Sequence, residues 1–128
     1  YVIAHELGHH IQKLTGVADK VQRAQSRASK VEGNQYQVAM ELQADCYAGV
    51  WAAHASEASG GKVALEQGDL EEGLKTANAI GDDTLQRNAG RNVTPEAFTH
   101  GTSAQRVEWL QKGYKSGDPQ QCDTFSGL

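Results

Sequence analysis

The sequence predicts a mainly α-helical fold, and three observations lead to this prediction. Apolar residues recur every three or four positions over residues 1–14, as one face of a helix requires. A long alanine-rich stretch, residues 35–57, has the composition of a helix, and two later segments begin with capping-box sequences. No segment has a convincing strand pattern. The 128 residues are therefore expected to form one helical domain or part of one.

Three helices are expected in the first half of the chain. The first covers residues 1–14 and stops at Gly16; its apolar positions are Val2, Ile3, Leu7, Ile11 and Leu14. Residues 17–29 form a polar helix of alternating charge, interpreted as a solvated surface helix. Gly33 and Asn34 mark a break before the long helix of residues 35–57, which ends close to a Ser-Gly-Gly sequence.

Two further helices are expected in the second half. A capping box formed by Asp69 and the Glu three residues later opens a helix over residues 69–80. Thr102 and the Gln three residues later open another, which extends to Gly117. The remaining segments are expected to be a loop with a short turn and an irregular tail, in residues 82–95 and 118–128.

Charge and composition exclude some classes of function. The chain has 12 Lys and Arg against 16 Asp and Glu, a net charge of −4, without any basic run. This balance argues against a nucleic-acid-binding surface. No stretch approaches the roughly 20 consecutive apolar residues of a membrane-spanning helix. A signal-peptide pattern is also missing from these residues.

The sequence His5-Glu6-Leu7-Gly8-His9 is an H-E-x-x-H motif on a predicted helix. The spacing of four places both imidazoles on one face, about 6 Å apart, which suits two corners of a zinc tetrahedron. Glu6 lies about 100° round the helix from His5 and can act as general base on a water molecule at the metal. The alternative interpretation of the bare motif is a helix with two surface histidines.

A catalytic zinc ion needs a third protein ligand. A third histidine continuing the motif is excluded, because Gln and Thr occupy the positions where Gly and His would be required. Glu41 is the best candidate, and Asp45 is the next. Both share a helix face with small residues that allow two helices to approach closely. Asp45 is expected to hold the outer nitrogen of either histidine. The alternative is an ordinary exposed acidic face.

Four runs of residues resemble the bacterial neutral zinc metallopeptidases. They are YVIAHELGHHIQ, ELQADCYAGVW, FTHGTSAQR and GDPQQCDTF, at residues 1–12, 41–51, 98–106 and 117–125. Together they cover the chain from end to end in the same order. More distantly, the chain is similar to the membrane-bound prenyl-protein and heat-shock metalloproteases, which share the Glu-x-x-x-Asp element.

The resemblance implies a zincin in which His5, His9 and Glu41 bind Zn²⁺. Members of this family are longer proteins with an N-terminal membrane anchor and an extracytoplasmic peptidase domain. The H-E-x-x-H motif lies almost at the start of the chain. Residues 1–128 are therefore expected to be a single-domain fragment, the helical C-terminal part of a zincin-like metallopeptidase domain, without its N-terminal part.

His100 is a candidate catalytic electrophile that would hold the carbonyl oxygen of the substrate opposite the metal. It lies in a loop entering the helix capped at Thr102, and a glycine follows it. The related membrane metalloproteases have a similar Thr-His segment near the substrate. The alternative is that His100 only caps a loop. Arg106, one turn further on, is expected to orient Glu41 or Asp45.

Cys46 and Cys122 are the only cysteines, one on a predicted core helix and one in the tail. They are expected to form a disulfide that pins the tail; the alternative is two reduced thiols in a cytoplasmic protein. His10 points away from the metal face, and His54 is interpreted as a surface histidine.

The predicted function is hydrolysis of peptide bonds in a polypeptide substrate, by zinc-activated water with Glu6 as general base. Two alternatives remain open: a catalytically silent, zinc-stabilised scaffold or binding domain, and a zinc hydrolase acting on a non-peptide amide.

Overall fold

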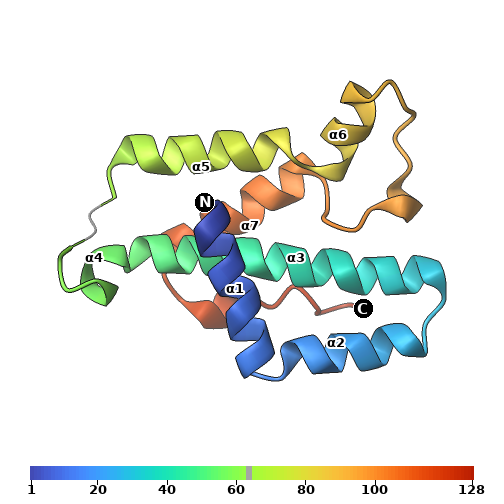
Figure 1. Ribbon diagram of the computed structural model, residues 1–128, viewed down its shortest axis with the longest axis horizontal. Coiled ribbons are helices and arrows are strands. Elements are labelled where there is room, and N and C mark those ends of the chain that lie inside the picture. The colour runs from blue at the N-terminus through green and yellow to red at the C-terminus, as the bar shows by residue number, and fades with distance from the viewer. Residues whose placement is uncertain (63–64) are drawn as a thin grey trace.

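The computed structural model describes residues 1–62 and 65–128, and within them it contains helices and no strand. The predicted mainly α fold is therefore confirmed (Figure 1). The elements are α1 (Val2–Leu14), α2 (Val17–Ser26), α3 (Lys30–Ala53), α4 (Ala55–Ala58), α5 (Gln67–Ala79), α6 (Asp82–Asn88), the 3-10 turn η1 (Pro95–Ala97), α7 (Ser103–Ser116) and the 3-10 turn η2 (Pro119–Gln121).

Helix α3 is the centre of the fold, with α1 crossing it and α7 packed along it (Figure 1). Glycines allow these helices to approach closely. A Cβ atom on Gly49 would lie 2.2 Å from the carbonyl oxygen of Leu110, and one on Gly113 would lie 1.9 Å from that of Cys46. Any larger residue at either position would force α3 and α7 apart.

Helix α3 begins earlier than the sequence pattern predicts. The side chain of Ser29 caps it by accepting a hydrogen bond of 3.2 Å from the backbone N–H of Glu32. Gly33 and Asn34 therefore lie inside the helix, and the predicted break at these residues is wrong. A glycine inside a helix costs about 1 kcal/mol, which a good N-cap residue offsets. At the other end, the predicted helix is interrupted at His54, after which α4 forms a separate turn.

The second half differs in two places from the prediction. The capping box of α5 is formed by Glu66 and Asp69, so the predicted box starts three residues too late. Part of the segment expected to be a loop forms the helix α6. The capping box of α7 is confirmed: Thr102 accepts from the N–H of Gln105 at 3.0 Å, and the Gln105 side chain accepts from the N–H of Thr102 at 2.9 Å.

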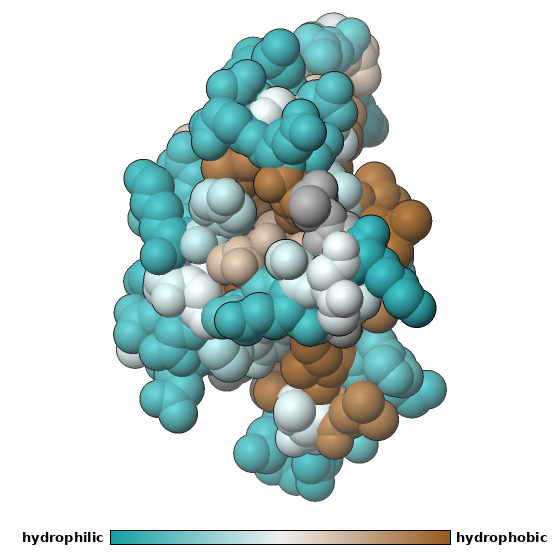
Figure 2. Space-filling model, turned by 90° about the vertical axis from the view of Figure 1, so that its left-hand side faces the viewer, coloured by the Kyte–Doolittle hydropathy of each residue, from teal (hydrophilic) through white to brown (hydrophobic). Residues whose placement is uncertain are grey.

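The two faces of α1 have unusual surroundings. Its apolar residues point away from α3 and are 41–80% exposed, namely Val2, Ile3, Leu7, Ile11 and Leu14. The face against α3 is made of small and polar residues, Ala4, His5, Gly8 and Gln12, all buried. Brown hydrophobic groups alternate with teal hydrophilic ones along the right-hand edge of Figure 2, which is the side that faces the viewer in Figure 1, where α1 lies in front of α3. The apolar stripe of a helix ordinarily faces the core of the protein. In α1 the apolar stripe is exposed and the small and polar face is buried, which is the reverse of the usual arrangement.

The tail is attached to α3 by the predicted disulfide, which is confirmed. Cys46 and Cys122 are 76 residues apart in sequence, and their Cα atoms are 5.6 Å apart. The hydroxyl group of Thr124 also donates a hydrogen bond to the carbonyl oxygen of Ala39. None of the helices in residues 1–62 and 65–128 combines the length and the apolar character needed to cross a bilayer.

Candidate metal centre

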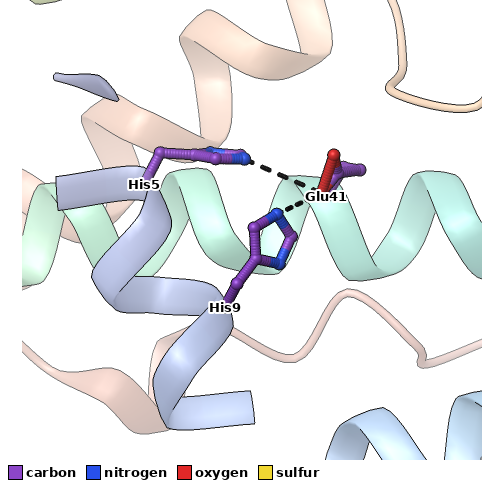
Figure 3. Close-up of side chains that lie close together, drawn as sticks. All are labelled: His5, His9 and Glu41. Atoms are coloured by element: carbon purple, nitrogen blue, oxygen red, sulfur yellow. Dashed lines mark ion pairs between the residues drawn. The ribbon is translucent and has the colours of Figure 1, made fainter. Parts of the chain in front are cut away.

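Three potential ligands converge where α1 crosses α3 (Figure 3). One ligand atom each from His5, His9 and Glu41 lies within 4.8 Å of the other two. Glu41 Oε2 lies 2.5 Å from His9 Nε2 and 3.7 Å from His5 Nε2. Two ligands bound about 2.0 Å from one zinc ion are roughly 3.3 Å apart in a tetrahedron, so small side-chain adjustments suffice to accommodate it.

Gly8, between the two histidines, makes this crossing possible. A Cβ atom at this position would lie 2.8 Å from the carbonyl oxygen of Ala44 and 3.0 Å from its Cα atom. The backbones of α1 and α3 are therefore in contact at Gly8. Since His5 and His9 lie one turn apart on this face, both imidazoles reach Glu41 from the same side.

The outer nitrogen of His5 is held by a buried ionic network. His5 Nδ1 lies 2.8 Å from Asp45 Oδ1, and Asp45 is fully buried. Arg106 donates to both carboxylate oxygens of Asp45, at 2.8 and 3.2 Å, and the Tyr1 hydroxyl donates to Asp45 Oδ1 at 2.5 Å. Burial alone would raise the pKa of Asp45, but the bonds from His5 and Arg106 hold it below its usual range. The sequence leaves open which histidine Asp45 contacts and which of the two carboxylates Arg106 orients. In the structure Asp45 contacts His5, and Arg106 donates hydrogen bonds to Asp45.

The outer nitrogen of His9 is held by an uncharged group. His9 Nδ1 lies 2.8 Å from Oε1 of Gln12, a side chain that is fully buried. Gln12 excludes a third histidine in the motif, but its contact with His9 is not among the predictions from the sequence. The signal was present, because residues three apart on a helix are neighbours.

The donor set fits a zinc ion. Both Nδ1 atoms face oxygen acceptors, so the Nε2 lone pairs point towards Glu41. Glu41 is buried, and its Oε2 atom accepts no hydrogen bond from the described part of the chain. A buried carboxylate oxygen without a hydrogen bond is costly unless a cation compensates it. Two imidazole nitrogens and one carboxylate oxygen are the ligands of a common class of catalytic zinc sites.

The electrostatics of the three residues agree with this fit. Burial alone would lower the pKa of His5, but its contacts with the carboxylates of Asp45 and Glu41 outweigh burial and raise the pKa to about 9. The contact with the Glu41 carboxylate is the main cause of the raised pKa of His9. Burial acts to raise the pKa of Glu41, yet its contacts with the two histidines bring it well below the usual range. A cation at this position would compete with protons for the same lone pairs.

Glu6 and His100 open to a cavity of about 300 Å³ beside the centre, whose walls also include Tyr1, His5 and Glu41. Glu6 itself is exposed. His100 Nε2 lies 3.3 Å from Glu41 Oε1, and about half of the His100 side chain is exposed. The structure thus places four of the five predicted site residues around one cavity, and the fifth, His9, contacts Glu41 without lining that cavity. Their roles as ligands and catalytic groups stay predictions.

The loop that carries His100 is held by Asp82, a residue not predicted from the sequence to belong to the site. Asp82 Oδ2 accepts hydrogen bonds from the backbone N–H groups of Thr99, His100 and Gly101, at 2.9, 2.7 and 2.9 Å. Asp82 begins α6, and α6 lay in a segment expected to be a loop. The contact joins residues 17 to 19 positions apart, so no local pattern could have revealed it.

The other two histidines lie outside the centre. His10 is exposed on α1, and the cluster of potential ligands does not include it. His54 Nε2 lies 2.7 Å from the carbonyl oxygen of Gly117, and its Nδ1 lies 3.2 Å from Glu57. Both positions agree with the interpretations drawn from the sequence.

A helical scaffold that brings two imidazoles and one carboxylate together defines a candidate metalloprotein. Comparison of the sequence with known families narrows this class. The chain belongs to the family described as "Putative neutral zinc metallopeptidase", whose sequence profile matches residues 1–125.

Several curated proteins are similar to the chain. It is 55% identical over 125 residues to the "Uncharacterized protein YpfJ" of Escherichia coli (strain K12), covering 98% of this chain and 42% of that protein. It is 48% identical over 132 residues to the "Uncharacterized protein Rv2575" of Mycobacterium tuberculosis (strain H37Rv), covering 98% and 43%. The chain thus spans less than half the length of these relatives. No solved structure matches it.

Proposed function

We propose that this chain carries the metal site of a zinc-dependent peptidase, with His5, His9 and Glu41 as ligands. One observation supports this most strongly: two Nε2 lone pairs converge on a buried carboxylate oxygen that accepts no hydrogen bond from the described residues. The family to which the chain belongs supports zinc as the metal. Peptide bonds in polypeptides are the proposed substrate, and a nucleic-acid substrate is not expected from the net charge of −4.

In this proposal each group beside the cavity has a chemical task. Zinc, when bound, supplies a Lewis acid and lowers the pKa of a water molecule to about 7. The Glu6 carboxylate accepts a proton from the attacking water and delivers it to the leaving amine. The His100 imidazole donates a hydrogen bond to the carbonyl oxygen of the substrate as that oxygen gains negative charge. Asp45 and Gln12 hold the imidazole rings in place.

The arrangement around Glu6 favours a catalytic site over a zinc-stabilised scaffold. A purely structural zinc site is closed by four protein ligands. Here, among the residues that the structure describes, only three candidate ligands come together, two of them, His5 and Glu41, line a cavity of about 300 Å³, and the exposed carboxylate of Glu6 opens to the same cavity. A non-peptide amide substrate would need the same groups, so the choice between the two substrates depends on an activity assay.

The substitution Glu6→Gln tests the proposal, because it removes only the proton acceptor. Zinc content should stay at about one ion per chain, while hydrolysis of an unstructured protein such as casein should fall by at least ~100-fold. Glu71→Gln, an exposed residue on α5, is the matched control. The same changes should be made in full-length YpfJ, because residues 1–128 span only part of such relatives. Undiminished hydrolysis by the Glu6 variant would contradict the general-base role.

We also propose that residues 1–128 are a fragment of a longer, membrane-anchored peptidase that acts outside the cytoplasm. The greater length of the relatives supports the proposal that the chain is a fragment. The disulfide between Cys46 and Cys122 supports a location outside the cytoplasm, since such bonds persist in oxidising compartments. Fusion of the full-length protein to reporters active on only one side of the membrane would test its location.

A further inference from the structure

A row of buried side-chain amides extends from His9 to the disulfide. Gln12 Oε1 lies 2.8 Å from His9 Nδ1, and Gln12 Nε2 donates to the carbonyl oxygen of Met40 at 2.7 Å and to Gln43 Oε1 at 2.9 Å. Gln43 Nε2 in turn donates to the carbonyl oxygen of Cys122 at 2.9 Å. Gln12 is fully buried and Gln43 is 6% exposed.

The direction of these hydrogen bonds is imposed by the two backbone carbonyls. A carbonyl oxygen can only accept, so Met40 requires the NH₂ group of Gln12 and Cys122 requires that of Gln43. Both amides are then fixed, because rotating either by 180° would bring two oxygen atoms together. Gln12 is left with its oxygen facing His9. The His9 Nδ1 atom must therefore be the donor, and in the neutral ring this leaves the lone pair on Nε2.

We propose that Gln12 and Gln43 are positioning residues that fix the tautomer and ring orientation of His9, with the carbonyls of Met40 and Cys122 as their anchors. This inference rests on the proposed function, since it gives the His9 Nε2 lone pair to a zinc ion. Removal of a group that hydrogen-bonds the outer nitrogen of a metal-binding histidine typically lowers metal affinity about 10- to 100-fold. Here the uncharged amide of Gln12 contacts the outer nitrogen of His9, whereas the carboxylate of Asp45 contacts the outer nitrogen of His5.

The protein contains a matched control for this arrangement. Gln25 Nε2 donates to the carbonyl oxygen of Gly33 and to Gln37 Oε1, both at 3.1 Å. Gln37 Oε1, like Gln43 Oε1, therefore accepts a hydrogen bond from a glutamine amide that also donates to a backbone carbonyl oxygen. Gln37 and Gln43 both lie on α3. No histidine takes part in these two hydrogen bonds. The substitution Gln37→Met removes the equivalent acceptor without touching the His9 row.

The test compares Gln12→Met, Gln43→Met and Gln37→Met with the wild-type chain. Zinc dissociation constants are measured by competition with a chelator, and the ring N–H protons by ¹H–¹⁵N correlation with and without zinc. Gln12→Met should weaken zinc binding by about 10- to 100-fold and expose the His9 Nδ1–H to rapid exchange. Gln43→Met should have the same effects to a smaller degree, because Met40 still anchors Gln12. The His5 Nδ1–H is the internal reference and should not change.

The outcomes separate this inference from the proposed function. Wild-type zinc affinity and a protected His9 ring proton in Gln12→Met would overturn the inference. If Gln12→Met fails to fold, Gln43→Met decides: results equal to those of Gln37→Met would overturn it. A wild-type chain that binds no zinc would contradict the proposed function instead. The ring protons of the metal-free protein would then still show whether Gln12 and Gln43 control His9.

Discussion

The two histidines of the motif are held in opposite ways, although they lie one turn apart on α1. Behind His5 is an ionic side, made of Asp45, Arg106 and Tyr1. Behind His9 is an amide side, made of Gln12 and Gln43 and anchored on backbone carbonyls. Charge orients the first ring, and hydrogen-bond direction orients the second.

This difference predicts how much stability the protein should lose when a residue of either side is replaced. Removal of one charge from a buried ion pair leaves the partner charge uncompensated, which costs about 3–5 kcal/mol. Removal of one amide leaves unpaired neutral groups, at about 1–3 kcal/mol. The ionic side should therefore contribute more to stability, whereas both sides should contribute similarly to zinc affinity.

Asp45→Asn should have the largest effect, because it leaves the Arg106 charge buried without a counter-charge. Both residues are at most 3% exposed. We expect the free energy of unfolding to fall by about 3–5 kcal/mol and zinc affinity to fall about 10- to 100-fold. Urea denaturation and chelator competition measure the two effects. Asp19→Asn, exposed on α2, removes the same charge and should change stability by less than about 0.5 kcal/mol. Equal effects of the two substitutions would contradict the prediction that the buried ion pair of Asp45 and Arg106 stabilises the protein.

Replacing both cysteines by serine should destabilise the fold by about 2–4 kcal/mol, since the disulfide joins residues 76 positions apart. This change loosens the tail whose Cys122 carbonyl anchors Gln43, so it acts on the amide side. Ring exchange at His9 should accordingly increase while that at His5 stays as in wild type. Unfolding of the wild-type chain with and without a reducing agent gives the matched comparison. Faster exchange at both rings would show that the tail does not act through the amides alone.

Gly8→Ala should disturb both sides equally, because it separates the two helices that carry them. The added Cβ would meet the carbonyl oxygen of Ala44 at 2.8 Å, and this oxygen belongs to the backbone. Overpacking of this kind costs about 1–3 kcal/mol. Thermal unfolding of zinc-loaded and metal-free protein measures the loss. Gly33→Ala, on α3 with no atom near the new Cβ, should instead stabilise the helix by about 0.5–1 kcal/mol. A Gly8 variant as stable as wild type would contradict the close crossing.

Local patterns predicted the parts of the structure that depend on neighbours in sequence. The spacing of His5 and His9 is such a pattern, and so is the capping box of Thr102 and Gln105. The helix period also indicates Glu41, because it shares one face of a predicted helix with Asp45 and with small residues further along. The start of α3 was misplaced because the Ser29 cap outweighs the helix-breaking tendency of the glycine and asparagine that follow.

The rest of the candidate site depends on contacts between distant residues. Gln43 and Cys122 are 79 positions apart, and Arg106 and Asp45 are 61. The helix period indicates which residues share a face, but not which face meets which neighbour. Helix α1 shows this limit: its apolar stripe is exposed, and the face with Gly8 and Gln12 is buried. Only the packing of α1 on α3 reveals that Gln12 also bonds Met40 and Gln43.

The smallest expected effect is that of Arg106→Lys, which keeps the charge and removes the paired geometry. Arg106 uses two nitrogens on Asp45 and a further bond of 3.0 Å to the Tyr1 hydroxyl. A lysine ammonium group is a single charge that cannot reproduce this fork. We expect a loss of about 1–2 kcal/mol in unfolding free energy and a decrease in zinc affinity of less than about 10-fold. Exchange at the His5 ring should increase while His9 is unaffected, the reverse of Gln12→Met. Arg106→Lys with both rings unchanged would mean that charge alone orients His5, and equal changes at both rings would show that the two sides are one network.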